Sequence, residues 1–221
     1  MNIKHHLDEA SLVSYAAGSI SQSMALVAAC HISMCPKCQK RVSESESIGG
    51  ILLESLNESE IAEDALEQVM ACLDNEPETG IVAAQMNQKS SVDLGVPQPL
   101  QDYISGSLEN IPWKRIVPGV YYHDLPLKSE RGGVSKLLKI APGKSMLPHT
   151  HDGNELTLVL KGSFSDEVGR FTAGDIADLD SEIEHQPLVD SDEDCICLIA
   201  TDAPLKFSTL FGRIVQPMTG F

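Results

Sequence analysis

The chain has 221 residues and a formal net charge of −16. This length is enough for one large domain or for two modest domains, each with its own core. The acidic balance argues against direct nucleic-acid binding, because no basic stripe exists to neutralise phosphates, and it permits a basic protein partner.

Neither a membrane span nor an export signal is visible. No apolar run approaches the ~20 residues that a membrane helix needs, and the longest run near the start is 24–30. The N-terminus lacks the apolar stretch of a signal peptide. Six cysteines in such a chain indicate a reducing compartment, where thiols bind metal or sense redox state instead of forming disulfides. We therefore expect a cytoplasmic protein without membrane association.

The first third of the chain is predicted to be helical, because it mixes Ala, Leu, Ser and Glu with few β-branched runs. A metal-binding pattern interrupts it: His31, Cys35 and Cys38 form an H-x3-C-x2-C motif, whose paired thiolates suit one tetrahedral ion. Pro36 disfavours a continuous helix but is favoured as a first helical residue. We expect one helix to end near His31 and another to begin at Pro36, with the ion joining both ends.

The motif supplies three ligands, and a fourth is expected from the N-terminal segment. His5 and His6 are adjacent there, and the sequence does not choose between them. The alternatives to structural zinc are two ordinary thiols or a thioredoxin-like redox pair, but no βαβ pattern surrounds the motif. Structural zinc is the favoured interpretation.

A clearer amphipathic helix follows this motif. Its apolar residues return at helical spacing, and acidic residues occupy the other side. The apolar stripe includes Ile61, Leu66, Val69 and Leu73. It is either a partner-binding surface or part of the core of the small helical domain, since a four-helix unit of this size needs most of its apolar residues internally.

The composition changes at residue 74. Residues 74–100 are rich in Pro, Gly and Ser without sustained periodicity, which is typical of a flexible connection. Strands are predicted beyond it, with tight hairpins near Gly162 and Gly169. The predicted strands include 134–140, 155–160, 195–200 and 207–211.

These patterns predict a multidomain chain. A small all-α domain of four helices, residues 1–85, is followed by a linker, 86–100, and by an all-β barrel or sandwich, 101–221.

A second set of candidate metal ligands lies in the β half. His149, His151 and Glu155 stand at offsets of two and four within a strand-like pattern, which would place them on one face. Two imidazoles and a carboxylate suit zinc, iron or manganese. His185 is a fourth candidate. The alternative is a set of polar residues on a half-exposed strand.

These residues resemble the first motif of the cupin superfamily, G-x5-H-x-H-x3,4-E-x6-G, at every position from Gly143 to Gly162. The second motif matches in part. Gly174 and His185 have the family's separation, whereas other residues replace its Pro, Gly and Asn. The resemblance implies a cupin-like barrel with His185 as the fourth metal ligand.

Cys195 and Cys197 lie two residues apart in a predicted strand and therefore share a face. Both thiols are expected to point into the barrel, near the metal or near each other. They are either two small core residues or a redox-responsive pair.

Both motifs in tandem make nearly the whole chain, 1–221, similar to the zinc-binding anti-sigma factors of the ChrR type. The resemblance implies an N-terminal anti-sigma domain and a C-terminal cupin-like sensor domain. It also implies two bound metal ions per chain, both zinc, although the sequence does not fix the metal of the second site. The first zinc site would comprise His6, His31, Cys35 and Cys38. The second would comprise His149, His151, Glu155 and His185.

The family resemblance further implies a regulator that is not an enzyme. It would sequester an extracytoplasmic-function-type sigma factor and release it on an oxidative signal such as singlet oxygen. The alternatives are a dioxygenase-like cupin enzyme with an added helical domain and a metal-storage protein. The incomplete second cupin motif and the helical zinc site count against the enzyme. Cupins often pair through their sheets, so a homodimer through the C-terminal half stays open.

Overall fold

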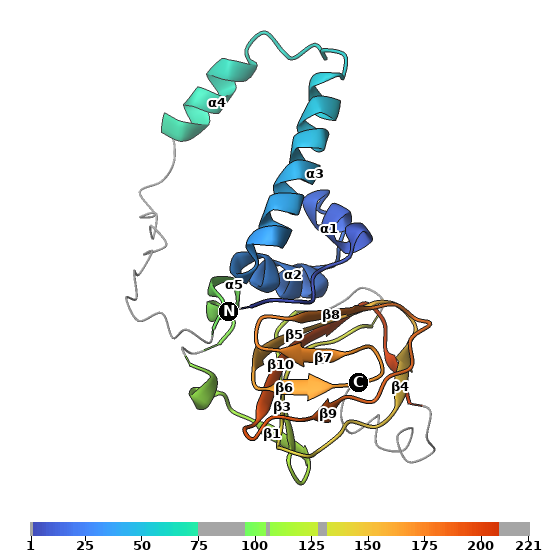
Figure 1. Cartoon of the computed structure of the whole chain (residues 1–221). Helices are drawn as coiled ribbons and strands as arrows, with labels where there is room; N and C mark the ends of the chain where they lie inside the picture. The colour runs from blue at the N-terminus through green and yellow to red at the C-terminus, as the bar shows by residue number, and fades with distance from the viewer. Residues whose placement is uncertain (1, 75–95, 105–106, 128–131, 208–221) are drawn as a thin grey trace.

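The computed structural model describes residues 2–74, 96–104, 107–127 and 132–207, except the side chains of Asp74, His151 and residues 205–207. A helical unit lies against a β-barrel-like unit (Figure 1). None of the helices in these ranges combines the length and apolar character needed to cross a membrane.

The helices begin where the sequence supplies caps. Helix α1 (Glu9–Ala16) is capped by Asp8, and α2 (Gln22–Met34) is capped by Ser21. Helix α3 (Pro36–Glu54) starts at Pro36, so the predicted break before this residue is confirmed. Helix α2 nevertheless runs about one turn beyond His31, because its hydrogen bonds continue until proline removes the next donor.

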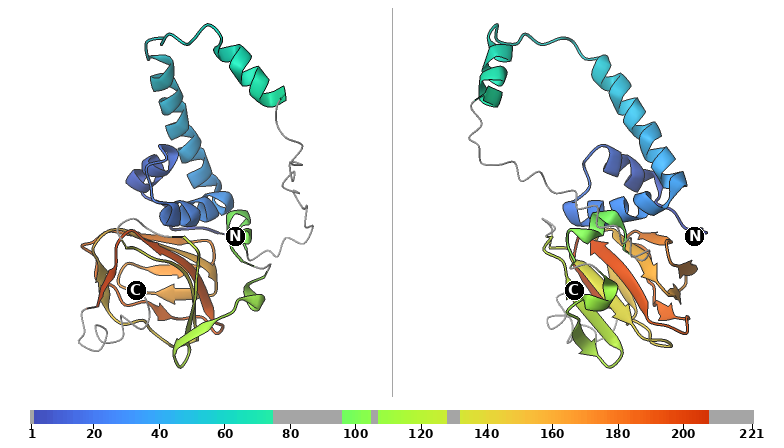
Figure 2. Two further views of the ribbon diagram at one scale, coloured as in Figure 1. Left: turned by 180° about the vertical axis from the view of Figure 1, so that it is seen from behind. Right: turned by 90° about the vertical axis from the view of Figure 1, so that its left-hand side faces the viewer.

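Two further helices follow, α4 (Ala65–Asp74) and the short α5 (Gln98–Gln101). Helix α4 lies apart from α1–α3 in all three views (Figures 1 and 2). Helix α5 contacts α2, and its Leu100 is fully buried. Residues 96–100, predicted as the end of a flexible linker, therefore belong to the packed structure, because Val96 and Leu100 are apolar enough to join the core.

The β half contains eleven strands in the described ranges. They are β1 (Lys114–Val117), β2 (Val120–Asp124), β3 (Ser135–Ile140), β4 (His149–His151), β5 (Glu155–Lys161), β6 (Ser163–Ser165), β7 (Arg170–Thr172), β8 (Ile176–Leu179), β9 (Leu188–Val189), β10 (Cys195–Thr201) and β11 (Leu205–Phe207). The large sheet has the order β1-β2-β3-β10-β5-β8, and smaller sheets have the orders β11-β4 and β7-β6-β9.

The central strands of the large sheet are buried on both faces. In β5, Leu156, Leu158 and Leu160 pack in the core shared with the helices, whereas Val159 packs inside the barrel. Strand β10 alternates in the same way. Strands covered on both sides read as continuous apolar runs, which explains why these two were readily predicted. Because α2 contacts β5 and β10, the helical unit and the barrel share a core.

Two sequence predictions are wrong in detail. Gly162 does not form a hairpin, because β5 and β6 belong to different sheets; it turns the chain from one sheet to the other with φ +73°. Nor do His149 and Glu155 share a strand, since β4 ends at His151 and β5 begins at Glu155. The turn near Gly169 does join β6 to β7 as a hairpin. Of the predicted strand 207–211, only residue 207 lies within the described residues.

Two candidate metal centres

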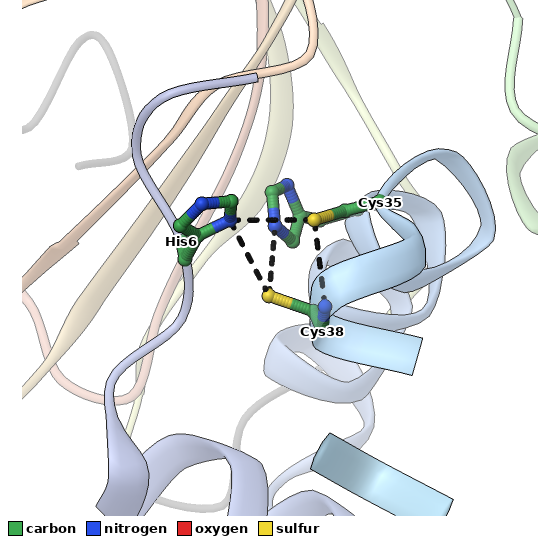
Figure 3. A group of neighbouring side chains, drawn as sticks. His6, Cys35 and Cys38 are labelled. Atoms are coloured by element: carbon green, nitrogen blue, oxygen red, sulfur yellow. Dashed lines mark hydrogen bonds between the residues drawn. The ribbon is translucent and has the colours of Figure 1, made fainter. Parts of the chain in front are cut away.

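The first candidate centre joins the N-terminal segment to the start of α3 (Figure 3). Nδ1 of His6 lies 3.3 Å from Sγ of Cys35 and 3.8 Å from Sγ of Cys38. Nε2 of His31 lies 3.3 Å from Sγ of Cys38. In a tetrahedral zinc site, bonds of about 2.3 Å to sulfur and about 2.05 Å to nitrogen place these atoms roughly 3.6 Å apart. The four ligand atoms fit such an ion.

The ring of His31 is oriented for metal binding. Its Nδ1 donates a hydrogen bond of 3.0 Å to the carbonyl oxygen of Gly174, which can only accept, so Nε2 presents its lone pair to the cluster. Burial lowers the pKa of His31 to about 4, because the charged form loses its hydration. The imidazole is therefore neutral at physiological pH, as a ligand must be.

Both sulfur atoms lie at the N-terminus of α3. Cys35 is its N-cap residue, and its Sγ accepts a hydrogen bond of 3.5 Å from the backbone N–H of Cys38. A helix N-terminus stabilises negative charge on sulfur. Burial and the neighbouring Cys35 nevertheless raise the pKa of the Cys38 thiol to about 11. A bound cation would therefore replace the proton of this thiol.

The structure places His6, not His5, in the first cluster. The ring of His5 lies 4.3 Å from that of Phe171, measured between centroids, and its Nε2 donates to the carbonyl oxygen of Arg170. The two adjacent histidines thus point to different partners. Which of them reaches the cluster depends on a shift of one residue along the chain, and the composition does not reveal it.

The second candidate centre lies inside the barrel. Nε2 of His149 and Nε2 of His185 are 3.1 Å apart, and Oε1 of Glu155 lies 3.9 Å from Nε2 of His185. Each imidazole donates its Nδ1 hydrogen elsewhere: His149 to the carbonyl of Leu147 at 2.8 Å, and His185 to Asp166 at 3.0 Å. When the rings are neutral, as metal ligation requires, both Nε2 atoms carry lone pairs. A cation between them would turn their repulsion into attraction, so these residues fit a divalent metal.

His151 is the remaining predicted ligand of the second centre. Its backbone lies in β4 and pairs with Leu205, but its side chain lies outside the described residues. His149 and Glu155 meet through a reversal of the chain at residues 152–154, not through one strand face.

Sequence reasoning missed Asp166. Its side chain is fully buried and accepts hydrogen bonds from His185 and from the backbone N–H groups of Val168 and Gly169. Burial opposes ionisation, but these hydrogen bonds outweigh it and lower the pKa of Asp166. A carboxylate behind a ligating histidine fixes its ring and increases its basicity. The sequence signal would have been an aspartate opening a turn between two short strands.

Cys195 and Cys197 face the second centre. With His149, Glu155 and His185 they line one cavity of about 40 Å³, and their sulfur atoms are 3.6 Å apart. Hydrogen bonding to Cys195 and burial raise the pKa of Cys197, and the nearby charge of Glu155 raises it further. The thiol of Cys197 is therefore protonated at neutral pH in the metal-free structure.

Known proteins resemble this chain along nearly all its length. A family described as the ChrR Cupin-like domain matches residues 102–204. The anti-sigma-E factor ChrR of Cereibacter sphaeroides is 40% identical over 217 residues, which cover 98% of each chain. A crystal structure of Rhodobacter sphaeroides SigE in complex with the anti-sigma ChrR matches with 39% identity and a TM-score of 0.76. That match covers 91% of this chain and 100% of the other.

Proposed function

The chain belongs to the family of ChrR anti-sigma factors, and from that premise we propose that it binds and inhibits a sigma factor. The observation that carries the proposal is that the resemblance spans both halves and extends to a relative crystallised with SigE. Membership of this family favours a regulator over the dioxygenase-like enzyme.

The surface that we assign to the sigma factor lies on the outer half of α3 and on α4. In α4 and just before it, large apolar side chains are between 51% and 81% exposed, and those within α4 fall on one helical face. They are Ile61, Leu66, Val69, Met70 and Leu73. Ile48, Ile51 and Leu52 of α3 are exposed to a similar extent. An isolated helix as short as α4 is marginal in water, so its apolar face needs a partner.

The charge of the chain suits this partner. A sigma factor needs basic surfaces to contact DNA phosphates, and the chain carries a net charge of −16. Exposed acidic residues accompany the apolar face of α4, among them Glu60, Glu63 and Glu67. Acidic side chains would steer a basic partner to the apolar surface and add specificity. We place direct binding to nucleic acid outside this function.

We assign zinc to the first centre, held by His6, His31, Cys35 and Cys38. Zinc there would add folding energy, on the order of 10 kcal/mol, and join the N-terminal segment to α2 and α3. For the second centre we propose His149, His151, Glu155 and His185 as ligands, with zinc as the leading candidate metal. The two centres would give the chain two zinc ions.

We further propose that an oxidative signal releases the sigma factor. Metal-bound thiolates such as those of Cys35 and Cys38 are oxidisable, and losing one would weaken a centre on which the helical unit depends. Cys195 and Cys197 would be the redox-responsive thiols of the barrel. Singlet oxygen is one candidate signal, because imidazole and thiol groups can react with it.

The direct test is affinity capture of the tagged full-length chain from its native host, with the metal content measured on the same sample. The proposal predicts recovery of one sigma factor together with about two equivalents of zinc. Recovery of iron without any sigma factor would contradict it and favour the enzyme.

A further inference from the structure

Two consecutive barrel residues contact His31 and the chain directly before His6, the two histidines of the first centre. The carbonyl oxygen of Gly174 accepts the Nδ1 hydrogen bond of His31. The carboxylate of Asp175 accepts hydrogen bonds from the backbone N–H groups of Lys4, at 2.6 Å, and His5, at 2.9 Å, directly before His6. The barrel thus sets the position of one ligand ring and of the chain that carries the other.

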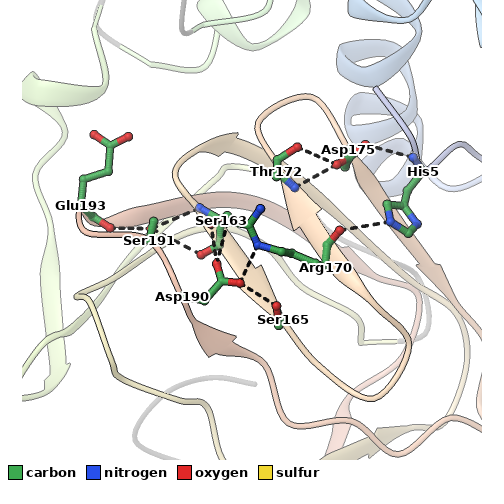
Figure 4. A network of polar contacts seen from close by, with 9 residues as sticks. All are labelled: His5, Ser163, Ser165, Arg170, Thr172, Asp175, Asp190, Ser191 and Glu193. Atoms are coloured by element: carbon green, nitrogen blue, oxygen red, sulfur yellow. Dashed lines mark hydrogen bonds and ion pairs between the residues drawn. The ribbon is translucent and has the colours of Figure 1, made fainter. Parts of the chain in front are cut away.

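Asp175 is itself firmly placed (Figure 4). It is fully buried, and its second oxygen accepts hydrogen bonds from the backbone N–H and the hydroxyl of Thr172, at 2.9 and 2.8 Å. Both oxygens are therefore occupied, one within the barrel and one with the N-terminal segment. Such a fully bonded buried carboxylate connects the two halves rigidly.

The same stretch of chain reaches the second centre at its other end. Asp166 accepts the Nδ1 hydrogen bond of His185 and is held by the backbone of Val168 and Gly169. The next residue, Arg170, accepts the hydrogen bond of His5 through its carbonyl. Residues 166–175 include β7. They therefore contact His185 at the second centre, and at the first centre they contact His31 and His5, the residue before His6.

We propose that Asp175 is a positioning residue for the first centre, and that residues 166–175 couple the metal occupancy of the two centres. This inference rests on the proposed metal binding at both sites. A metal held by His185 would fix Asp166 and the hairpin, and the hairpin would in turn fix His5 and Asp175. Because coupling between binding sites is reciprocal, each metal then strengthens binding of the other.

The first test titrates Co²⁺ into the metal-free full-length chain and follows the thiolate-to-cobalt absorption, which reports the first centre through Cys35 and Cys38. Outer contacts of ligating histidines are worth about 10- to 100-fold in metal affinity. We expect Asp175→Ala to lower the affinity by this factor and to shift the cobalt bands. Asp175→Asn, which keeps an acceptor for the N-terminal segment, should restore most of it.

The control is Asp124→Ala. Asp124 accepts hydrogen bonds from Lys114 and Lys136 on the large sheet, and within the described residues no hydrogen bond joins it to the N-terminal segment or to residues 166–175. This variant should leave the first-centre affinity unchanged. An equal loss in the Asp124 and Asp175 variants would indicate general destabilisation and overturn the positioning role.

The second test measures coupling. His149→Ala, which removes a ligand of the second centre, should lower the first-centre Co²⁺ affinity about 10-fold in the unmodified background and have little effect in Asp175→Ala. Equal affinities with and without His149 would overturn the coupling. If the unmodified chain gives no thiolate-to-cobalt bands, the first centre itself fails and the inference with it. Bands of equal affinity in every variant would overturn the inference alone.

Discussion

The imidazoles of His149 and His185 meet through their Nε2 atoms, which lie 3.1 Å apart. Their outward nitrogens are committed to the carbonyl of Leu147 and the carboxylate of Asp166. Each ring is thus fixed by a neighbour that can only accept a hydrogen bond. This arrangement of fixed tautomers, and not the mere proximity of two histidines, is what makes the cluster a candidate metal centre.

Removing the carboxylate behind His185 should therefore weaken the second centre without removing a ligand. We expect Asp166→Ala to lower the metal affinity of this centre by about 10- to 100-fold, measured by competition with a chelator. Asp192→Ala, at a surface loop of the same barrel, should have no effect. Unchanged affinity in Asp166→Ala would show that the ring of His185 is held by other contacts.

Cys38 leads to a prediction about protons. Its pKa is raised to about 11, first by burial and then by Cys35, so at pH 7 the thiol is protonated in the metal-free protein. A ligating sulfur must be deprotonated. Zinc binding at pH 7 should therefore release at least one proton, measured by calorimetry in buffers of different ionisation enthalpy. Cys38→Ser should release fewer protons; identical release in both proteins would contradict the assignment.

At the scale of elements, α4 and the outer half of α3 differ from the rest of the structure, because their apolar side chains lie exposed. Gly49 and Gly50 lie within α3, where glycine lowers intrinsic helix stability. Neither the intrinsic helix propensity of these residues nor packing within the described structure explains why the apolar side chains lie on these faces. We therefore propose that a partner protein covers them.

A single charge on this surface should weaken binding and spare the fold. Leu66→Asp places a carboxylate on the apolar face of α4, where the side chain is 75% exposed. We expect the affinity for the captured sigma factor to fall at least 10-fold, with thermal stability within about 0.5 kcal/mol of the original. Gln68→Glu, which adds a charge to the opposite face, is the control. Equal affinity in all three proteins would place the sigma factor elsewhere.

Two glycine turns test the packing of the barrel. Gly143 and Gly162 both have positive φ, +67° and +73°. A Cβ at Gly143 would have no neighbour within 4 Å, whereas one at Gly162 would lie 2.9 Å from the carbonyl oxygen of Asp194. Gly143→Ala should therefore cost about 1 kcal/mol, the left-handed penalty alone. Gly162→Ala should cost about 2–4 kcal/mol in denaturant unfolding, and equal costs would contradict this description of the corner.

Helices and strands were predictable where the pattern of neighbouring residues determines them. The apolar runs of β5 and β10, the break at Pro36 and the helical period of α4 all follow from residues close together in the chain. The partners of each site residue were not predictable, because they are distant in sequence. Gly174 meets His31 and Asp175 meets Lys4 only after the helical unit packs on the large sheet. The choice between His5 and His6 depends on the same contact.

At the scale of the whole molecule, the helical unit and the barrel share one core. Leu26 and Val27 of α2 belong to the same buried cluster as Leu156 and Leu198 of the large sheet. Separate domains on a loose linker would respond to signals independently, whereas a shared core lets a change in the barrel reach the first centre. The exposed end of α3 and the whole of α4 lie outside this shared core and are therefore available to contact a partner.

The measurement that tests the central claim most directly is transcription in vitro, with purified core RNA polymerase and the sigma factor captured from the native host. The account predicts that one equivalent of the zinc-loaded chain abolishes transcription from the cognate promoter, and that Leu66→Asp restores it. Undiminished transcription in the presence of excess zinc-loaded chain would contradict the anti-sigma function.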